Sequence, residues 1–222
     1  MFPAFAGYWL WTPPETACAM KTASTDNPRS GITKAARHLL ERGGISALSM
    51  RSIAKHLGVS AMMPYKHFPS KDHILMELRL EAFQRLTTHM RRAQAVAQTP
   101  TDALVAVSQA YVEFALKAPN DYRLMFDAWE FENYAQISAD FGDSISREAD
   151  SWHVNLDAVT AFAEAENLAI DCNFAAHWLW SSLHGMVQLH LSRKLAFGME
   201  IQQLEHIFCE KIPTSIRAFS QK

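Results

Sequence analysis

Apolar residues recur at a helical period along most of the chain, and this periodicity restricts the fold more than any other feature of the sequence. One face of the stretch 28–43 shows the i, i+3, i+4, i+7, i+8 spacing of a helix that packs on one side. The residues on that face are Ile32, Ala35, Ala36, Leu39 and Leu40. No alternating run with hairpin turns is long enough to predict a sheet. The sequence therefore predicts an all-α fold.

Caps, glycines and prolines divide this pattern into nine expected helices. They lie at about residues 28–43, 50–57, 61–67, 71–97, 100–117, 120–127, 144–166, 172–195 and 199–211. Side chains that can cap helices precede most of them: Asn27, Ser49, Ser60, Ser70, Thr99, Asn120 and Asp171. Pro64 falls at the fourth position of the third helix, where it removes only the first backbone hydrogen bond. Residues 130–142 are apolar without a clear period, and we expect a loop that lines a cavity.

The net charge of −2 conceals an uneven distribution along the chain. Residues 25–92 hold twelve Lys and Arg against five Asp and Glu, whereas residues 93–222 hold eight against seventeen. A basic segment joined to an acidic remainder indicates a polyanion-binding module on a body that polyanions repel. The alternative is a chance distribution of surface charge.

Two short helices joined by a tight turn at Gly58, after a supporting helix and before a long one, describe a helix-turn-helix inside the basic segment. Its apolar, glycine and aromatic positions are Ala35-Ala36, Gly43, Leu48-Ser49-Met50-Arg51-Ser52-Ile53-Ala54, Leu57-Gly58-Val59-Ser60, Tyr65-Lys66-His67-Phe68 and Lys71. In this pattern, residues 32–75 resemble the N-terminal DNA-binding domain of TetR-family transcriptional regulators.

This resemblance implies a role in DNA binding for each exposed position of the motif. Ser60 would cap the recognition helix, whose apolar start would meet thymine methyl groups in the major groove. Polar and charged side chains, some at positive helix ends, would contact phosphates. The implied DNA-binding residues are Arg51, Ser60, Ala61, Met62, Met63, Tyr65, Lys66, His67 and Lys71. Alternatively, Tyr65 is a capping aromatic and His67 an ordinary surface histidine.

The remaining chain resembles the helical ligand-binding and dimerisation domain of the same family, in the subgroup with a Trp-x-x-x-His-Gly motif, here Trp180, His184 and Gly185. Large side chains there suit either a bundle core or an apolar cavity. The candidate ligand-binding residues are Tyr111, Phe114, Met125, Phe126, Trp129, Trp152, Trp180 and His184. Candidate orienting groups are His153, His177, His184 and Gln188. The resemblance also implies a homodimer, whose interface we expect on helices 172–195 and 199–211.

The expected organisation has four parts: a mobile N-terminal extension at 1–25, a helix-turn-helix domain at 26–70, a connecting helix at 71–98 and a ligand-binding and dimerisation domain at 99–222. The apolar stretch 1–11 has no preceding basic residue and is cut off by prolines, so we expect neither a signal peptide nor a membrane anchor. Met20 is a second possible start. Three scattered cysteines favour a reducing compartment, the cytoplasm.

The sequence contains no phosphate-cradling glycine loop, nucleophile elbow or zinc-protease motif, so we expect no enzyme and no cofactor. The spacing of His177, His184 and His190 disfavours a metal site. The predicted function is a DNA-binding transcriptional regulator, a repressor released from a pseudo-palindromic operator by a small hydrophobic ligand. The alternatives are a helical small-molecule-binding protein or enzyme with a non-functional helix-turn-helix, and a regulator without a small-molecule effector.

Overall fold

The computed structural model describes residues 27–126, 134–196 and 198–220; in these ranges it is helical and contains no strand. The all-α prediction is therefore confirmed. The α-helices are α1 (Pro28–Gly43), α2 (Met50–Leu57), α3 (Lys71–Val96), α4 (Pro100–Lys117), α5 (Pro119–Phe126), α6 (Tyr134–Phe141), α7 (Asp150–Ala165), α8 (Cys172–Leu191) and α9 (Ile201–Arg217). Three 3-10 segments complete the described chain: η1 (Ile45–Ala47), η2 (Pro64–Lys66) and η3 (Gly142–Ala149). The expected extension at 1–25 lies outside the described residues.

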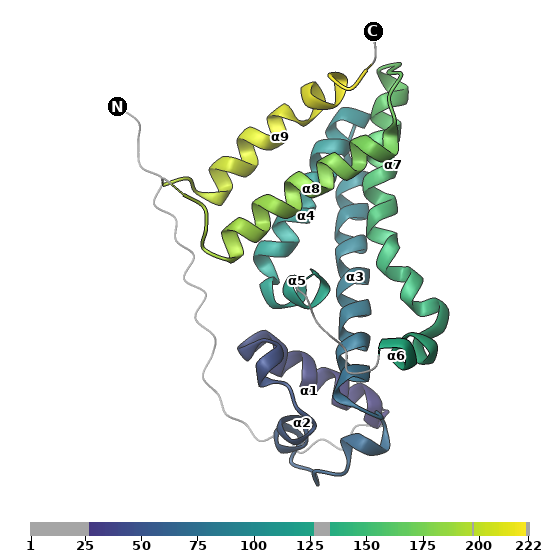
Figure 1. Cartoon of the computed structure of the whole chain (residues 1–222), viewed down its shortest axis with the longest axis vertical. Coiled ribbons are helices and arrows are strands. Elements are labelled where there is room, and N and C mark those ends of the chain that lie inside the picture. Colours follow the sequence, from purple (N-terminus) through teal and green to yellow (C-terminus); the bar gives the residue numbers. More distant parts are fainter. Residues whose placement is uncertain (1–26, 127–133, 197, 221–222) are drawn as a thin grey trace.

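The long helix α3 connects the two parts of the molecule (Figure 1). Its first turns pack with α1 and α2 around a small core that includes Ile32, Ile53 and Phe68, each fully buried. Its later turns pack against α4 and α7, and residues of α8 and α9 complete a larger core with them. Residues of the same helix, α3, therefore belong to both cores.

Four predicted N-caps have the expected local geometry. The side chains of Asn27, Thr99 and Asp171 accept hydrogen bonds from backbone amides in the first turn of α1, α4 and α8. Ser49 forms a reciprocal capping box with Ser52 at the start of α2. These caps satisfy amides that a helix end leaves without partners, which is why the starts of these helices could be predicted closely.

In the C-terminal part of the chain, the structure corrects the prediction at four elements. The expected loop 130–142 contains α6, which begins at Tyr134, and α7 begins at Asp150 rather than near 144 because η3 precedes it. Helix α8 ends at Leu191, four residues before the expected end. Helix α9 continues to Arg217 although Pro213 lies inside it. Pro213 is buried with Ile212 and Ile216, and this apolar contact offsets the lost backbone hydrogen bond.

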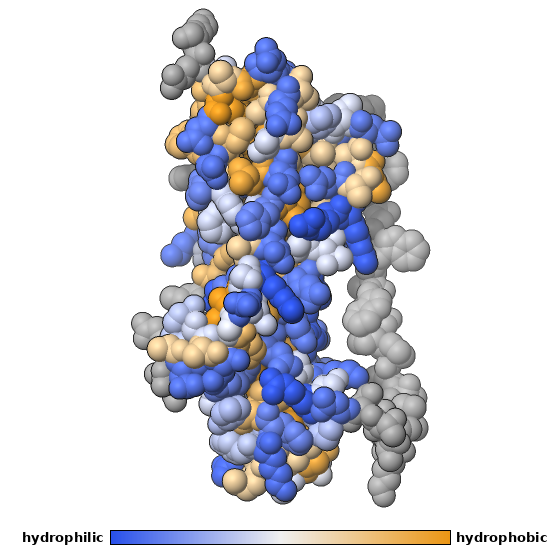
Figure 2. All heavy atoms as spheres, turned by 90° about the vertical axis from the view of Figure 1, so that its right-hand side faces the viewer, coloured by the Kyte–Doolittle hydropathy of each residue, from blue (hydrophilic) through white to orange (hydrophobic). Residues whose placement is uncertain are grey.

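Seen from the side of α6 and α7, the surface is mostly hydrophilic, and apolar patches gather toward the end opposite the helix-turn-helix (Figure 2). Among the described helices, none combines the length and apolar character needed to cross a bilayer.

Candidate functional site

The helix-turn-helix begins with α2 and a sharp turn at its end. Gly58 adopts a left-handed conformation (φ 67°), and its amide hydrogen bonds to the carbonyls of Ala54 and Lys55. A side chain at this φ would be strained, so glycine fits the position for a conformational reason. After this turn the chain runs to η2, which packs against α2.

The segment expected to be the recognition helix is not an α-helix. Residues 61–63 form a turn and η2 follows, with i→i−3 hydrogen bonds from Met63 N to Ser60 O (3.0 Å) and from Lys66 N to Met63 O (3.1 Å). Pro64 has no amide proton to give to the Ser60 carbonyl, and this explains the tighter pattern. The expectation that the helix tolerates Pro64 was therefore wrong.

Most of the predicted DNA-contacting side chains nevertheless share an exposed surface. Met62 is 65% exposed and Tyr65 50% exposed. Packing in a core does not account for an apolar and an aromatic side chain that are this exposed. The other exposed members of the set are Arg51, Ser60, Ala61 and Lys66. Met63 differs, since it is half-buried against the small core rather than free to enter a groove. His67 and Lys71 are also half-buried.

Arg29 of α1 fixes the end of this segment against α3. Its Nη1 donates to the backbone carbonyl of His67 (3.2 Å), and its Nη2 pairs with Glu77 (2.6 Å). The guanidinium also lies 4.1 Å from the ring centroid of Phe68. These contacts hold the exposed surface in a defined position relative to the start of α3.

The start of α3 has an unusual cap. Ser70 makes no side-chain hydrogen bond to the backbone of the first turn; its hydroxyl instead lies 2.9 Å from Nδ1 of His73. Nε2 of His73 lies 2.8 Å from Asp140 of α6, and this hydrogen bond lowers the pKa of the Asp140 carboxyl. The first-turn amides of α3 therefore lack a serine cap, and they lie beside Lys71.

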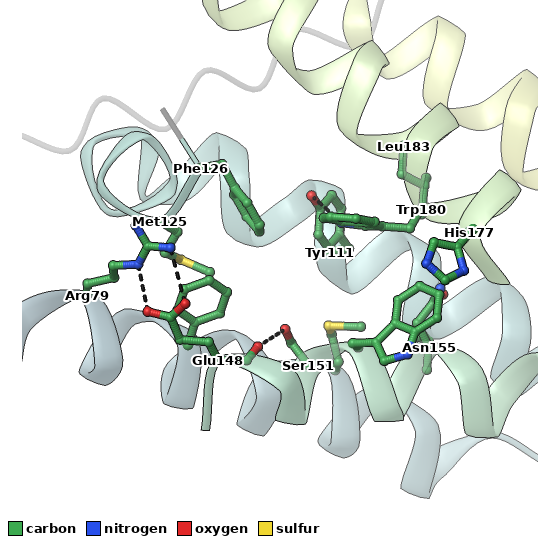
Figure 3. A pocket seen from close by; sticks show the side chains of 14 residues that line it. Arg79, Tyr111, Met125, Phe126, Glu148, Ser151, Asn155, His177, Trp180 and Leu183 are labelled. Carbon is green, nitrogen blue, oxygen red and sulfur yellow. Dashed lines mark hydrogen bonds and ion pairs between the residues drawn. The ribbon is translucent and has the colours of Figure 1, made fainter. Parts of the chain in front are cut away.

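A second candidate site is a cavity of about 420 Å³ between α3, α4, α5, α7 and α8 (Figure 3). Its walls are mostly aromatic and aliphatic, as expected for a site that holds an apolar molecule. The lining residues are Arg79, Phe83, Met90, Val107, Tyr111, Met125, Phe126, Glu148, Ser151, Trp152, Asn155, His177, Trp180 and Leu183.

Behind one wall of the cavity, four side chains form a hydrogen-bonded chain in which each polar group has a partner. Trp180 Nε1 donates to the Tyr111 hydroxyl (3.2 Å), which lies 2.8 Å from the Tyr122 hydroxyl, and this in turn lies 2.7 Å from Nδ1 of His184. Burial raises the pKa of Tyr111, so its phenol stays protonated. Because these groups are satisfied by one another, the wall presents ring surfaces to the cavity.

The cavity is polar at two ends. At one end Arg79 and Glu148 form a bidentate ion pair, with Nε–Oε1 and Nη2–Oε2 distances of 2.7 and 3.1 Å. At the other end His177 and Asn155 lie together on α8 and α7 (Figure 3). The ion pair is neutral as a unit, and the described lining residues include no further acidic or basic side chain except His177.

The structure places five of the eight predicted ligand-binding residues in this lining: Tyr111, Met125, Phe126, Trp152 and Trp180. His184 lies behind the wall in the hydrogen-bonded chain, and Phe114 lines a different groove between α3 and α4. Trp129 lies outside the described residues. Of the candidate orienting groups, only His177 is among the lining residues.

Helix α5 connects the cavity with the helix-turn-helix domain. Met125 and Phe126 line the cavity, whereas the adjacent Leu124 is fully buried in the small core with α1 and α3. Asn120, expected as a cap, instead donates its side-chain amide to the Glu41 carbonyl at the end of α1 (3.0 Å). Sequence reasoning missed this connection, because neither residue carries a local signal for a contact 79 positions away.

Two family models match this chain, one in its N-terminal part and one in its C-terminal part. A family model described as "Bacterial regulatory proteins, tetR family" matches residues 32–78, and one described as "Tetracyclin repressor-like, C-terminal domain" matches residues 104–212. The chain belongs to the TetR family. The family resemblance expected from the helix-turn-helix residues is therefore confirmed.

Individual TetR-family relatives match over shorter stretches. The HTH-type transcriptional regulator Rv1816 of Mycobacterium tuberculosis is 30% identical over 92 residues, which cover 40% of this chain and 39% of the relative. The HTH-type transcriptional repressor KstR of Mycolicibacterium smegmatis is 32% identical over 76 residues, or 34% of this chain and 37% of the relative. The chain thus spans about two fifths of the length of these curated relatives.

The fold extends further than these sequence matches. The solved structure of a protein from Rhodococcus sp. RHA1 superposes with a TM-score of 0.74 at 23% identity, covering 91% of this chain and 100% of that chain. This similarity shows the fold of the whole described molecule.

Proposed function

We propose that this TetR-family chain is a transcriptional regulator that binds double-stranded DNA through α2, η2 and the start of α3. The observation that carries the proposal is the exposed set around Met62, Tyr65 and Lys66 beside the first turn of α3, where the Ser70 side chain makes no cap hydrogen bond. Apolar side chains can contact thymine methyl groups, and amides at a helix start with a nearby Lys71 can bind a phosphate. Arg51 at the start of α2 would contact the backbone in the same way.

The shortened recognition segment affects how bases would be read. With η2 in place of an α-helix, Met62 and Tyr65 are the prominent side chains, and half-buried Met63 would support the segment from below. We expect replacement of Met62 to change base preference and replacement of Tyr65 to weaken binding to all sequences. Selection from random DNA by the wild type and by Met62→Gln tests this, and identical enriched sites would contradict the assignment.

A homodimer through α8 and α9 would place two such surfaces on one DNA molecule. These helices expose large apolar side chains, including Phe174 (57%), Leu189 (46%) and Ile207 (45%). In the part of the chain that the structure describes, no atom apart from the backbone of α8 and the two chain neighbours lies within 4 Å of a Cβ built on Gly185, so the space at this helix face is open to a partner.

The dimer has a direct test at Gly185. Gly185→Leu fits the isolated chain, because nothing described here blocks the side chain, but it would separate two closely packed α8 helices. Light scattering at micromolar concentration should give a dimer for the wild type and for Gln109→Leu, an exposed control on α4, and a monomer or weakened dimer for Gly185→Leu. A monomeric wild type would contradict the proposal.

The cavity supports the further proposal that a small apolar effector relieves repression. Its volume and aromatic walls suit such a ligand, and the relative KstR is named a repressor. A ligand that moves Met125 or Phe126 would shift α5, whose Leu124 and Asn120 contact the helix-turn-helix domain. A tilt of α3 would act along the same path, since α3 contributes residues both to the cavity and to the small core of the helix-turn-helix domain.

For this switch to work, the ligand must bind the DNA-free conformation more tightly than the DNA-bound one. A coupling free energy of about 1–3 kcal/mol would lower DNA affinity about 5- to 150-fold. Apolar compounds that raise the melting temperature should include some that lower operator affinity. If every such compound leaves operator affinity unchanged, the effector proposal fails while the DNA-binding proposal stands.

A further inference from the structure

The polar end of the cavity on α7 and α8 presents hydrogen-bond acceptors. Nδ1 of His177 lies 2.8 Å from the backbone carbonyl of Asn173 in the same helix. A carbonyl oxygen can only accept, so Nδ1 carries the proton, and in the neutral ring Nε2 holds a lone pair. Figure 3 shows the free edge of the His177 ring turned toward the cavity.

Asn155 also presents a hydrogen-bond acceptor to the cavity, because its amide nitrogen is bonded elsewhere. Its Nδ2 donates to the carbonyl of Ala176 (3.0 Å) in a buried hydrogen bond, which fixes the orientation of the amide. The group left to face the cavity is the carbonyl oxygen Oδ1. Asn155 is only 5% exposed, so water competes weakly for this acceptor.

Polar groups at the other walls of the cavity are occupied by one another. Arg79 and Glu148 share two hydrogen bonds, and Trp180 and Tyr111 belong to the chain that ends at His184. Within the described lining, no protein donor is paired with Nε2 of His177 or Oδ1 of Asn155, so a donor on a ligand can reach these acceptors, although His177 is also exposed to solvent. Trp152 lies against His177 with ring centroids 4.1 Å apart and ring planes tilted by 49°, which adds an apolar surface beside them.

We propose that the cavity recognises an uncharged, mostly aromatic or aliphatic ligand through a hydroxyl group that donates its one proton to His177 Nε2, beside the second acceptor, Asn155 Oδ1. The proposal rests on the effector-binding function of this cavity and specifies the chemistry of its ligand. A molecule of the same shape whose oxygen only accepts would leave both lone pairs unpartnered and bind less tightly. A ligand that is a fixed anion would gain nothing here, because two acceptors repel it.

Three matched probes separate these possibilities: hydroxypyrene, methoxypyrene and pyrene. Binding to the full chain is followed by quenching of tryptophan fluorescence, to which Trp152 and Trp180 in the lining contribute. Hydroxypyrene should bind about threefold to tenfold more tightly than methoxypyrene or pyrene, the range expected for one neutral hydrogen bond. Equal affinities, or a preference for methoxypyrene, would overturn the hydroxyl assignment while leaving the cavity as a ligand site.

Two variants test whether His177 causes the preference for hydroxypyrene over pyrene. His177→Phe keeps a ring beside Trp152 but removes the acceptor, so the affinity of this variant for hydroxypyrene should fall to about its own affinity for pyrene. The control His153→Phe changes an exposed histidine of α7 outside the lining and should keep that preference. An unchanged preference in His177→Phe would contradict the role of His177. If none of the three probes binds the wild type, the effector function of the cavity is itself wrong.

Discussion

Replacing Leu124 by Ala should weaken the connection between the cavity and the helix-turn-helix domain. Leu124 belongs to α5, yet its fully buried side chain packs in the small core with Ile32, Leu40 and Leu75. Truncation of a buried leucine removes its transfer free energy and leaves a cavity, a combined cost of about 2–5 kcal/mol. Because α1 and α3 surround Leu124, we expect the middle of that range or more.

A matched control separates this effect from general destabilisation. Leu104 is as deeply buried, but its contacts lie in the larger core. Urea unfolding should show that Leu124→Ala and Leu104→Ala lower the free energy of unfolding by comparable amounts. Hydrogen exchange should differ, because only Leu124→Ala should raise the exchange of α1 amides through local opening. A loss below about 0.5 kcal/mol for Leu124→Ala, or unchanged α1 exchange, would refute the connection through α5.

Three further predictions follow from single contacts. Lys71→Ala should lower the affinity for all DNA sequences by a similar factor. It should also reduce the slope of the logarithm of affinity against the logarithm of salt concentration by about one, because one phosphate contact is lost. Unchanged affinity and slope in a salt titration would contradict a phosphate contact. Tyr122→Phe should lower the free energy of unfolding by about 1–3 kcal/mol in urea, because His184 and Tyr111 lose a buried partner, and a neutral effect would argue against the hydrogen-bonded chain. The pKa of Asp140 is lowered in the folded state by its hydrogen bond from His73, so its contribution to stability is present above about pH 4 and is lost as the pH falls through the folded pKa. Asp140→Asn should remove that part of the acid dependence in thermal unfolding, and an identical pH profile would contradict it.

Local signals in the sequence were sufficient for most of the fold. Ser49, Thr99 and Asp171 cap helices at predicted places, because a cap needs only the side chain and the next three residues. The departures occur where tertiary contacts or a missing amide outweigh the local pattern. Pro64 converts the recognition segment to a 3-10 turn, and burial of Pro213 lets α9 continue past a residue that usually ends a helix.

The candidate sites were predictable to different degrees. The exposed surface around Met62 and Tyr65 follows from a contiguous motif, so its residues could be named from the sequence. The cavity is built from five helices, and only its large aromatic side chains gave a signal. Arg79 and Glu148 form their ion pair across 69 positions, and no local feature predicts such a pair.

Phe114 shows the limit of composition as a guide. It has the size and character of a cavity residue, but its position on α4 turns it toward the groove beside α3. Which face of a buried helix meets a cavity depends on packing angles that one sequence does not specify. Asn155 was overlooked for the opposite reason, because a single asparagine on a helix is unremarkable until its amide is seen to be fixed by the Ala176 carbonyl.

We propose that this chain couples a DNA-binding surface to an apolar ligand cavity. The most direct measurement is the affinity of the full chain for a duplex enriched from random DNA, determined by fluorescence anisotropy with and without a saturating compound that raises the melting temperature and quenches tryptophan fluorescence. We predict a duplex with dyad symmetry and a loss of affinity of about 5- to 150-fold when the compound is bound. An affinity that does not change although the cavity is occupied would contradict the coupling.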